Sequence, residues 1–320
     1  MAGPVSDERT AVVLPAEGPL APPARQGERT LERRRRAVAY LLLTPGTLYL
    51  ALFFALPLIL IIYTSLKSGG LLSGGGFRFT WQWENYTDGL ATYGSFYVRS
   101  VVYAGIATVA CILLAYPMAY WIAFYGGRWK SALFFMILVP FFVSFVIRTV
   151  QWRFLLGDFG LIFGPLKDLG LLPQDFRVLA TPLAVIAGIT YNFLPFTALP
   201  LYVALDRIDR SLIEAAKDLY ATKTEAFRKV VLPLSFPGLF AAVILTFVPA
   251  TGDYVNSSVL GGPNTTMIGQ IIQTKFLVEL RYPEAAALSV VLMVGMLLIA
   301  LLYAKALGTE DETLAAGAGA

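Results

Sequence analysis

The sequence predicts an all-α membrane protein with six transmembrane helices and both termini in the cytoplasm. Three observations support this fold class. Of the 320 residues, 57% are hydrophobic and only 14% are charged, whereas soluble proteins carry about 25% charged residues. The apolar residues are gathered in six stretches that lack Asp, Glu, Lys and Arg. Lys and Arg are concentrated in alternate connecting segments. So large an apolar surface must face lipid.

The six apolar stretches match the length of a bilayer-spanning helix. Such a helix needs about 17–25 residues, and the stretches contain between 17 and 30. The shortest ends before Arg148, which we expect to extend it by snorkelling to the membrane surface. Prolines recur inside the stretches, so we expect kinked helices whose free backbone groups are satisfied by neighbouring helices. The stretches are residues 37–66, 100–125, 131–147, 178–205, 232–252 and 285–304.

The distribution of Lys and Arg predicts the orientation. The two terminal segments and the loops 126–130 and 206–231 together carry 16, whereas the loops on the opposite side carry 7. Because cytoplasmic loops are enriched in Lys and Arg, both termini and the 206–231 loop are expected in the cytoplasm. This placement in loops also argues against a nucleic-acid partner.

The same observations divide the chain into three regions. Residues 1–36 are expected to be a disordered basic cytoplasmic tail, because they are rich in Pro, Ala, Gly and charged residues. Residues 37–305 form the six-helix transmembrane domain. Residues 306–320 are expected to be a short cytoplasmic tail, and the Gly- and Ala-rich segment after Leu307 is expected to be disordered like the first.

Missing residue types exclude several classes of enzyme. The chain contains no histidine and one cysteine, Cys111. It therefore lacks Ser-His and Cys-His nucleophile pairs and the zinc-protease motif. A Gly-x-x-x-x-Gly-Lys-Ser/Thr phosphate loop is also missing from the sequence, so the chain is not expected to hydrolyse ATP. We predict no catalytic residues, no metal ligands and no cofactor bound by this chain.

The 206–231 loop is predicted to form two short amphipathic helices. Ser211 and Glu214 have the spacing of a capping box, as do Thr222 and Glu225, and we expect a turn near Tyr220. Pro233 is expected to stop the second helix. Apolar residues recur at helical spacing in both parts. An exposed apolar face suits a docking site for a partner protein, but it also suits a helix pair lying on the membrane surface. The apolar positions are Ile208, Leu212, Ala215 and Leu219, then Phe227, Val230 and Val231.

Residues 214–221, Glu-Ala-Ala-Lys-Asp-Leu-Tyr-Ala, resemble the EAA loop of binding-protein-dependent ABC transporter permeases. The family has glycine at the position of Tyr220, and glycine adopts a left-handed turn that tyrosine adopts only at a cost. The resemblance implies that this loop couples the permease to a separate cytoplasmic ATPase. The implied coupling residues are Glu214, Ala215, Ala216, Asp218, Leu219, Tyr220, Ala221, Phe227, Val230, Leu232 and Pro233.

Further motifs are similar to those of the spermidine/putrescine permease subunits. They lie at residues 116–119, 139–142, 155–160, 191–196 and 248–254. Permeases for opines, sulfate, iron or phosphonate share several of them. The resemblance implies a type I ABC importer-like bundle in the cell membrane. The implied partners are a cytoplasmic ABC ATPase dimer that uses ATP, a second and different permease subunit, an extracytoplasmic solute-binding protein and the lipid bilayer.

Four residues are candidates for the translocation path. Asp253 and Tyr254 follow the fifth span, where a carboxylate and an aromatic ring could attract a polycation. The alternative for Asp253 is an acid exposed to water at the membrane interface. Tyr191 and Asn192 lie in the fourth span, where interhelical hydrogen bonding is the alternative to a role in the path.

Two other classes of function compete with the importer. A proton- or sodium-coupled transporter would need acids or histidines in mid-span, and the central turns of the six stretches have none. A passive channel or membrane scaffold has no use for an ATPase-coupling loop. Co-purification with an ATPase would separate the three.

Overall fold

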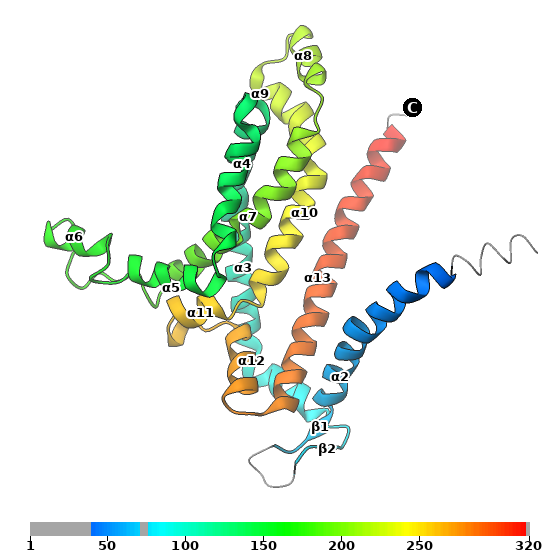
Figure 1. Cartoon of the computed structure of the whole chain (residues 1–320), viewed down its shortest axis with the longest axis vertical. Coiled ribbons are helices and arrows are strands. Elements are labelled where there is room, and N and C mark those ends of the chain that lie inside the picture. Colours follow the sequence, from blue (N-terminus) through cyan, green and yellow to red (C-terminus); the bar gives the residue numbers. More distant parts are fainter. Residues whose placement is uncertain (1–39, 71–75, 318–320) are drawn as a thin grey trace, which may run out of the picture. The chain divides into compact units, whose positions relative to one another are not determined.

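The computed structural model describes residues 40–70 and 76–317, with side chains up to residue 305 (Figure 1). The chain divides into two compact units, residues 1–59 and residues 60–320. The first unit is described from Tyr40 onward as the beginning of a helix, Tyr40–Ser65. This helix contains a wider π-helical turn, η1 (Ala51–Ala55), followed by α2 (Leu56–Ser65). The predicted tail at residues 1–36 lies outside the described residues.

The second unit is almost entirely helical. Residues 60–65 of α2 come first. Two antiparallel strands of two residues each follow, β1 (Lys67–Ser68) and β2 (Arg78–Phe79). The helices that follow are α3 (Glu84–Tyr125), η3 (Gly127–Trp129), α4 (Lys130–Leu138), η4 (Val139–Phe142), α5 (Phe145–Leu155), α6 (Phe163–Asp168), α7 (Pro182–Asp206), α8 (Arg210–Asp218), α9 (Lys223–Ala226), η5 (Phe227–Val231), α10 (Leu232–Thr251), α11 (Val255–Leu260), η6 (Pro263–Thr265), α12 (Ile268–Leu277) and α13 (Tyr282–Gly317).

The all-α membrane fold is confirmed. Within the described residues, five helices are long and apolar enough to span a membrane, and a sixth span is a broken pair bent by 90°. The second spanning helix is longer than expected, because α3 has 42 residues and begins at Glu84 rather than near residue 100. Its first turns contain charged and polar residues, so a search for uncharged stretches does not detect them.

The predicted third span, residues 131–147, is not one straight helix. Val143 and Ser144 have extended backbone between η4 and α5. Pro140 lies in η4 and has no N–H to donate. The helix therefore breaks before Arg148, and α5 leaves at a right angle to the preceding pair. In Figure 1, α5 runs across the direction of α4.

The core lies where α3, α7 and α10 pack against one another. One stripe of α3 consists of small residues at spacings of three or four, the repeat that keeps residues on one helical face. Small side chains let helix backbones approach closely, which is how membrane helices gain packing energy without a hydrophobic driving force. The stripe comprises Ala104, Ala107, Cys111, Ala115, Ala119 and Ala123, each 2% exposed or less.

Two glycines mark close approaches to α7. A Cβ on Gly238 of α10 would overlap the Ala204 side chain and the Pro200 carbonyl oxygen of α7. A Cβ on Gly188 of α7 would overlap Leu260 and Asn256 of α11. Any larger residue at either position would push these helices apart, so α7 holds both neighbours at fixed distances.

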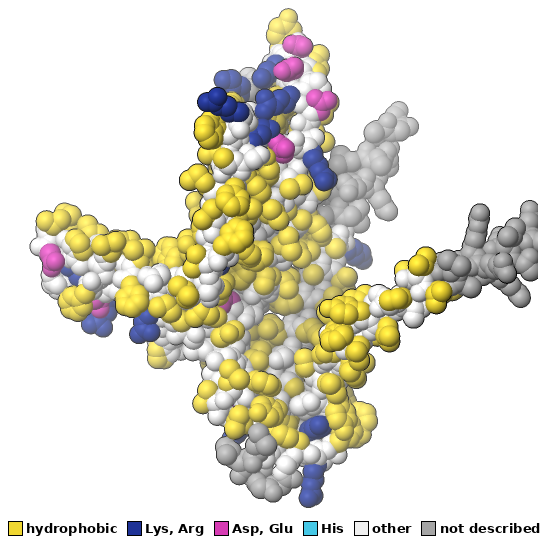
Figure 2. All heavy atoms as spheres, viewed as in Figure 1, with side chains coloured by type: hydrophobic (Ala, Val, Ile, Leu, Met, Phe, Trp, Pro, Cys, Tyr) yellow, Lys and Arg dark blue, Asp and Glu magenta, His cyan; other side chains and the backbone are white. Residues whose placement is uncertain are grey.

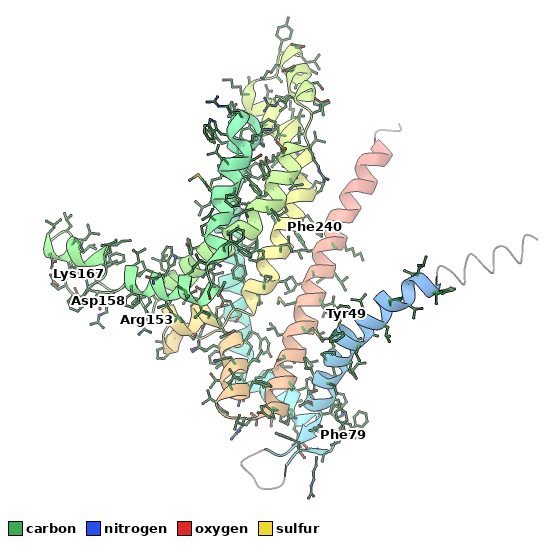
Figure 3. All side chains as sticks on the ribbon, in the orientation of Figure 1. Tyr49, Phe79, Arg153, Asp158, Lys167 and Phe240 are labelled. Carbon is green, nitrogen blue, oxygen red and sulfur yellow. The ribbon has the colours of Figure 1, made fainter. Side chains whose placement is uncertain are left out.

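The segment between α5 and α7 is held by a buried lysine. Lys167 is 6% exposed. Its Nζ donates to Asp158 Oδ1 at 2.9 Å and to the Gln174 carbonyl oxygen at 3.2 Å. Figure 3 labels Asp158 and Lys167 side by side in this segment, with Arg153 nearer the bundle. The hydrogen bonds of Lys167 hold the segment in a defined conformation.

The surface separates charge from apolar side chains (Figure 2). Lys, Arg, Asp and Glu gather around α8 and α9, whereas hydrophobic side chains cover the long middle of the visible face. This pattern is what a lipid-embedded bundle requires.

The short cytoplasmic tail at residues 306–320 stays a prediction, and α13 continues through this segment to Gly317. The added residues include Ala, Leu and Glu, which favour helix.

Candidate functional site

The predicted coupling loop, residues 206–231, contains the two expected short helices, α8 and α9. The first does not start at the predicted capping box of Ser211 and Glu214. Asp209 is its N-cap, and one carboxylate oxygen accepts the Ser211 backbone N–H at 2.9 Å. This hydrogen bond lowers the pKa of Asp209. Asp is as good an N-cap as Ser. Asp209 and Ser211 were therefore both possible caps, and the helix begins at the earlier one.

The second capping box is confirmed. Thr222 Oγ1 accepts the Glu225 backbone N–H, and a Glu225 carboxylate oxygen accepts the Thr222 backbone N–H at 2.8 Å. The bond to the Thr222 backbone lowers the pKa of Glu225. This reciprocal pair fixes where α9 begins.

The turn between the helices passes through a left-handed residue at the expected place. Tyr220 has φ of +63°, and its side chain is 97% exposed. A left-handed conformation costs a residue with a Cβ roughly 1–2 kcal/mol. The substitution of tyrosine for the family glycine therefore preserves the turn but adds strain.

Pro233 does not stop the second helix as predicted, because one continuous helix runs from Lys223 to Thr251. The π-helical turn η5 immediately precedes this proline, and the Leu232 N–H reaches back to the Phe227 carbonyl oxygen. A proline ring normally clashes with the carbonyl four residues earlier. The widened turn relieves this conflict.

The coupling loop is anchored to the bundle by polar and aromatic contacts. Arg210 donates to the Ala123 and Phe124 carbonyl oxygens at the end of α3, at 3.3 and 3.0 Å. A cation at this end of a helix is favoured by the helix dipole. Lys130 and Asp206 form an ion pair of 2.6 Å. These contacts attach the loop to the ends of α3 and α4.

Aromatic packing continues this anchor. The Phe227 ring lies edge-on to two tyrosines of α3, with ring centroids 5.9 Å from Tyr116 and 5.6 Å from Tyr120. The Tyr116 hydroxyl also hydrogen-bonds to Ser235 of α10 at 2.8 Å. The Tyr116 side chain of α3 thus contacts the loop through Phe227 and α10 through Ser235.

The outer face of α8 is apolar, and other described residues do not cover it. Leu212 is 47% exposed and Leu219 is 82% exposed, while Ala215 is exposed and Ala216 half-buried. Figure 1 shows α8 at the end of α7 and α10, away from α5 and α11. A rigid, exposed element with small residues can fit into a groove of another protein. Its role in coupling remains a prediction.

A second polar region lies buried where α5, α7 and α11 meet. We call Thr149, Asn192, Asp253 and Asn256 the polar cluster. Asn192 Nδ2 donates to Thr149 Oγ1 at 2.9 Å and to Asn256 Oδ1 at 3.1 Å. Asn256 Nδ2 donates to Asp253 Oδ2. For Asn192, the structure therefore shows the interhelical hydrogen bonding that was the alternative to a role in the path.

Asp253 is 6% exposed, so it is not the water-exposed interfacial acid of the alternative reading. Its Oδ1 accepts the backbone N–H groups of Val255 at 2.8 Å and Asn256 at 3.2 Å. Burial raises the pKa of the Asp253 carboxyl. The carboxyl group thus holds the start of α11 and connects it to the polar cluster. Tyr254 beside it is 45% exposed.

Arg148 does not snorkel, which corrects the prediction. The side chain is 6% exposed, and its guanidinium carbon lies 5.8 Å from the ring of Phe141, 5.7 Å from Phe145 and 5.9 Å from Tyr191. The break between η4 and α5 turns Arg148 inward, where a straight helix would have carried it to the membrane surface. Tyr191 also contacts Trp152, with ring centroids 5.3 Å apart.

Of the four predicted path residues, Asn192 and Asp253 meet in the polar cluster, and Tyr191 lies beside Arg148. Sequence reasoning missed Thr149 and Asn256. The available signal was their polarity next to apolar stretches, which has no meaning until the fold brings α5, α7 and α11 together. The role of Arg210 as an anchor also needed the position of the end of α3.

Comparison with known proteins identifies the family. Residues 112–307 match the family model described as binding-protein-dependent transport system inner membrane component. The chain belongs to this family. The permease is therefore a multi-pass protein of the inner membrane and a subunit of a transport system.

Curated relatives agree. The permease is 36% identical over 259 residues to the spermidine/putrescine transport system permease protein PotB of Escherichia coli, covering 81% of this chain and 94% of that protein. The PotB protein of Haemophilus influenzae is 36% identical over 224 residues, 70% of this chain and 78% of that protein. A probable molybdenum ABC transporter permease protein of Haloferax volcanii is 29% identical, covering 66% and 74% of the two chains.

Solved structures share the fold. A chain of a bacterial ABC transporter involved in the import of alginate aligns with a TM-score of 0.63 at 18% identity, covering 87% of the permease and 97% of that chain. A chain of the MetNI methionine ABC transporter in an inward-facing conformation aligns with a TM-score of 0.53 at 18% identity, covering 67% and 94%. The type I ABC importer-like fold expected from the sequence is confirmed.

Proposed function

We propose that this permease forms the translocation path of an ATP-driven importer of polyamines such as spermidine and putrescine. The observation that carries the proposal is the 36% identity to the E. coli spermidine/putrescine permease protein, which extends over 94% of that protein. Similarity of this length includes both the coupling loop and the polar cluster. The permease pairs with a second, different permease subunit and receives its solute from an extracytoplasmic binding protein.

In this proposal the coupling loop, around Glu214 to Ala221, seats in a cytoplasmic ABC ATPase dimer. Three features support this role: the exposed apolar face of α8, the caps at both helices, and the anchor of Arg210 on α3. Closure of the ATPase dimer on ATP would move the anchored loop as a rigid body. The bundle would then alternate between inward-open and outward-open states. ATP is used by the partner subunit.

Uptake by the complete transporter tests the proposal. The permease is expressed with its ATPase, partner permease and binding protein in cells that lack polyamine uptake. We expect radiolabelled spermidine to accumulate, and unlabelled putrescine to compete with it. Uptake should stop when ATP is depleted and should persist when the proton gradient alone is collapsed.

The competing readings give different outcomes in the same assay. Competition by sulfate or phosphonate without competition by putrescine would show that the permease transports an oxyanion and not a polyamine. Uptake that follows the proton or sodium gradient and ignores ATP would make it a secondary transporter. Failure of an ATPase to co-purify with the permease would also contradict the proposal.

A further inference from the structure

The guanidinium group of Arg148 is a buried cation with no matching anion among the described residues. Among the residues whose side chains the structure describes, Arg148 makes no ion pair, and its Nε and Nη1 atoms are enclosed without a hydrogen-bond partner. Its surroundings are the rings of Phe141, Phe145 and Tyr191, which we call the aromatic cage. The guanidinium carbon lies 5.7 to 5.9 Å from all three ring centroids.

Cation–π attraction is thus the main interaction that compensates this charge. A cation within about 6 Å of a ring centroid is attracted by the ring face, most strongly where water is excluded. The two unpaired N–H groups work against it, because a buried donor without a partner is destabilising. The guanidinium therefore fits the aromatic cage by its charge, but not by its hydrogen bonds.

A primary ammonium group suits the same three rings. It is a compact cation with three rotatable N–H donors, whereas a guanidinium holds its N–H donors in a fixed planar fork. Rings that attract the charge and offer no acceptor to a fixed fork therefore favour the ammonium group over the guanidinium.

We propose that the aromatic cage is a binding site for a primary ammonium group, and that Arg148 occupies this site as a resident cation until the substrate displaces it. The inference rests on the proposed polyamine transport and names a site for it. Phe145 belongs to α5 as Arg148 does, so the guanidinium would leave the aromatic cage by a change in its own side-chain conformation, with all three rings kept in place. An incoming ammonium group would gain these three rings.

Direct binding measurements test the inference. The full-length permease is purified into lipid nanodiscs, and radiolabelled spermidine is equilibrated with wild type and with Arg148→Ala, Arg148→Gln and Arg148→Lys. The two neutral variants should bind spermidine about tenfold or more tightly than wild type, because the competing cation is gone. Arg148→Lys keeps a cation in the aromatic cage and should bind like wild type.

Two further variants serve as controls. Arg153→Ala removes an exposed arginine from the same helix and should leave spermidine binding unchanged. Adding Tyr191→Leu to Arg148→Ala should abolish most of the gain, since it removes one ring of the aromatic cage. Gel filtration and thermal unfolding show whether each variant is folded. Arg148→Gln, which preserves most of the side-chain length, provides the test if Arg148→Ala does not fold.

Two outcomes would overturn the inference. The neutral variants could bind spermidine no better than wild type, or wild type could bind radiolabelled sulfate in a manner that Arg148→Ala abolishes. The second result would make Arg148 an anion-binding residue. Spermidine uptake by the wild-type transporter, together with no gain in binding by the neutral variants, would refute this inference alone. No polyamine uptake by the wild type would refute the proposed function instead.

Discussion

The coupling loop and the polar cluster satisfy their polar groups in opposite ways. In the coupling loop, local bonds close both helix starts: Asp209 caps α8, and Thr222 and Glu225 cap each other. The apolar face of α8 is left exposed. In the polar cluster, the partners come from three separate helices, and the buried Asn192 Oδ1 has no partner among the described residues. One region closes its polar groups locally and exposes an apolar surface, whereas the other is enclosed and closes its polar groups only through contacts between helices.

The largest expected effect is on the exposed face. We expect Ala216→Asp to reduce spermidine uptake by more than about tenfold, because a charge buried without a partner in an interface costs roughly 2–5 kcal/mol. ATPase activity of the complex should no longer rise with substrate. Ser211→Asp places the same charge in the first turn of α8, where an acid is favoured, and serves as the control. Substrate-stimulated ATPase activity in Ala216→Asp at the wild-type level would show that this face does not couple transport to ATP.

The next effect is on the enclosed region. Asp253→Ala should lower the free energy of unfolding by about 2–3 kcal/mol, because two backbone N–H groups of α11 and the Asn256 amide lose their acceptor. Thermal unfolding in detergent micelles measures this change. Asp253→Asn should be milder, since its amide oxygen can still accept the backbone bonds. If uptake by Asp253→Asn equals that of wild type, Asp253 supports α11 and does not attract the substrate.

A smaller effect is expected at the turn of the coupling loop. Tyr220→Gly should raise the free energy of unfolding by up to about 1 kcal/mol, since glycine adopts a positive φ without strain. Tyr220→Ala keeps the strain and should show no gain. Equal thermal unfolding of the two variants would mean that the left-handed turn is not a source of strain.

The smallest effect is a pH dependence of the second cap. The pKa of Glu225 is lower in the folded protein, so its contribution is complete above the ordinary glutamate pKa of about 4.3. The contribution is lost as the pH falls further, through the folded-state pKa. The protection factors of the α9 amides, which express exchange relative to the intrinsic rate at each pH, should therefore fall in wild type below about pH 4.3. In Glu225→Gln this change should be weaker, because the neutral amide oxygen can accept the Thr222 N–H at any pH. Identical pH profiles would contradict the role of the carboxylate.

Local patterns in the sequence were enough for the features that depend on neighbours along the chain. Charge-free stretches located five spanning helices and the region of the sixth. The spacing of Thr222 and Glu225 identified the second capping box, and the glycine expected at Tyr220 marked the left-handed turn. Each of these depends on backbone geometry within a few residues. The error at Ser211 arose because two good caps stood close together, and nothing local distinguished Asp209 from Ser211.

The sequence by itself determined that this protein spans a membrane and where its second short loop helix begins, because lipid burial and short-range capping are properties of composition and spacing. Only the tertiary structure decided which polar groups meet. Arg148 turns inward because the third span breaks beside Pro140. Whether Asp253 is buried or exposed to water depends on where α11 packs. Contacts among α5, α7 and α11 join residues up to 107 positions apart, and no spacing in the sequence encodes such distances.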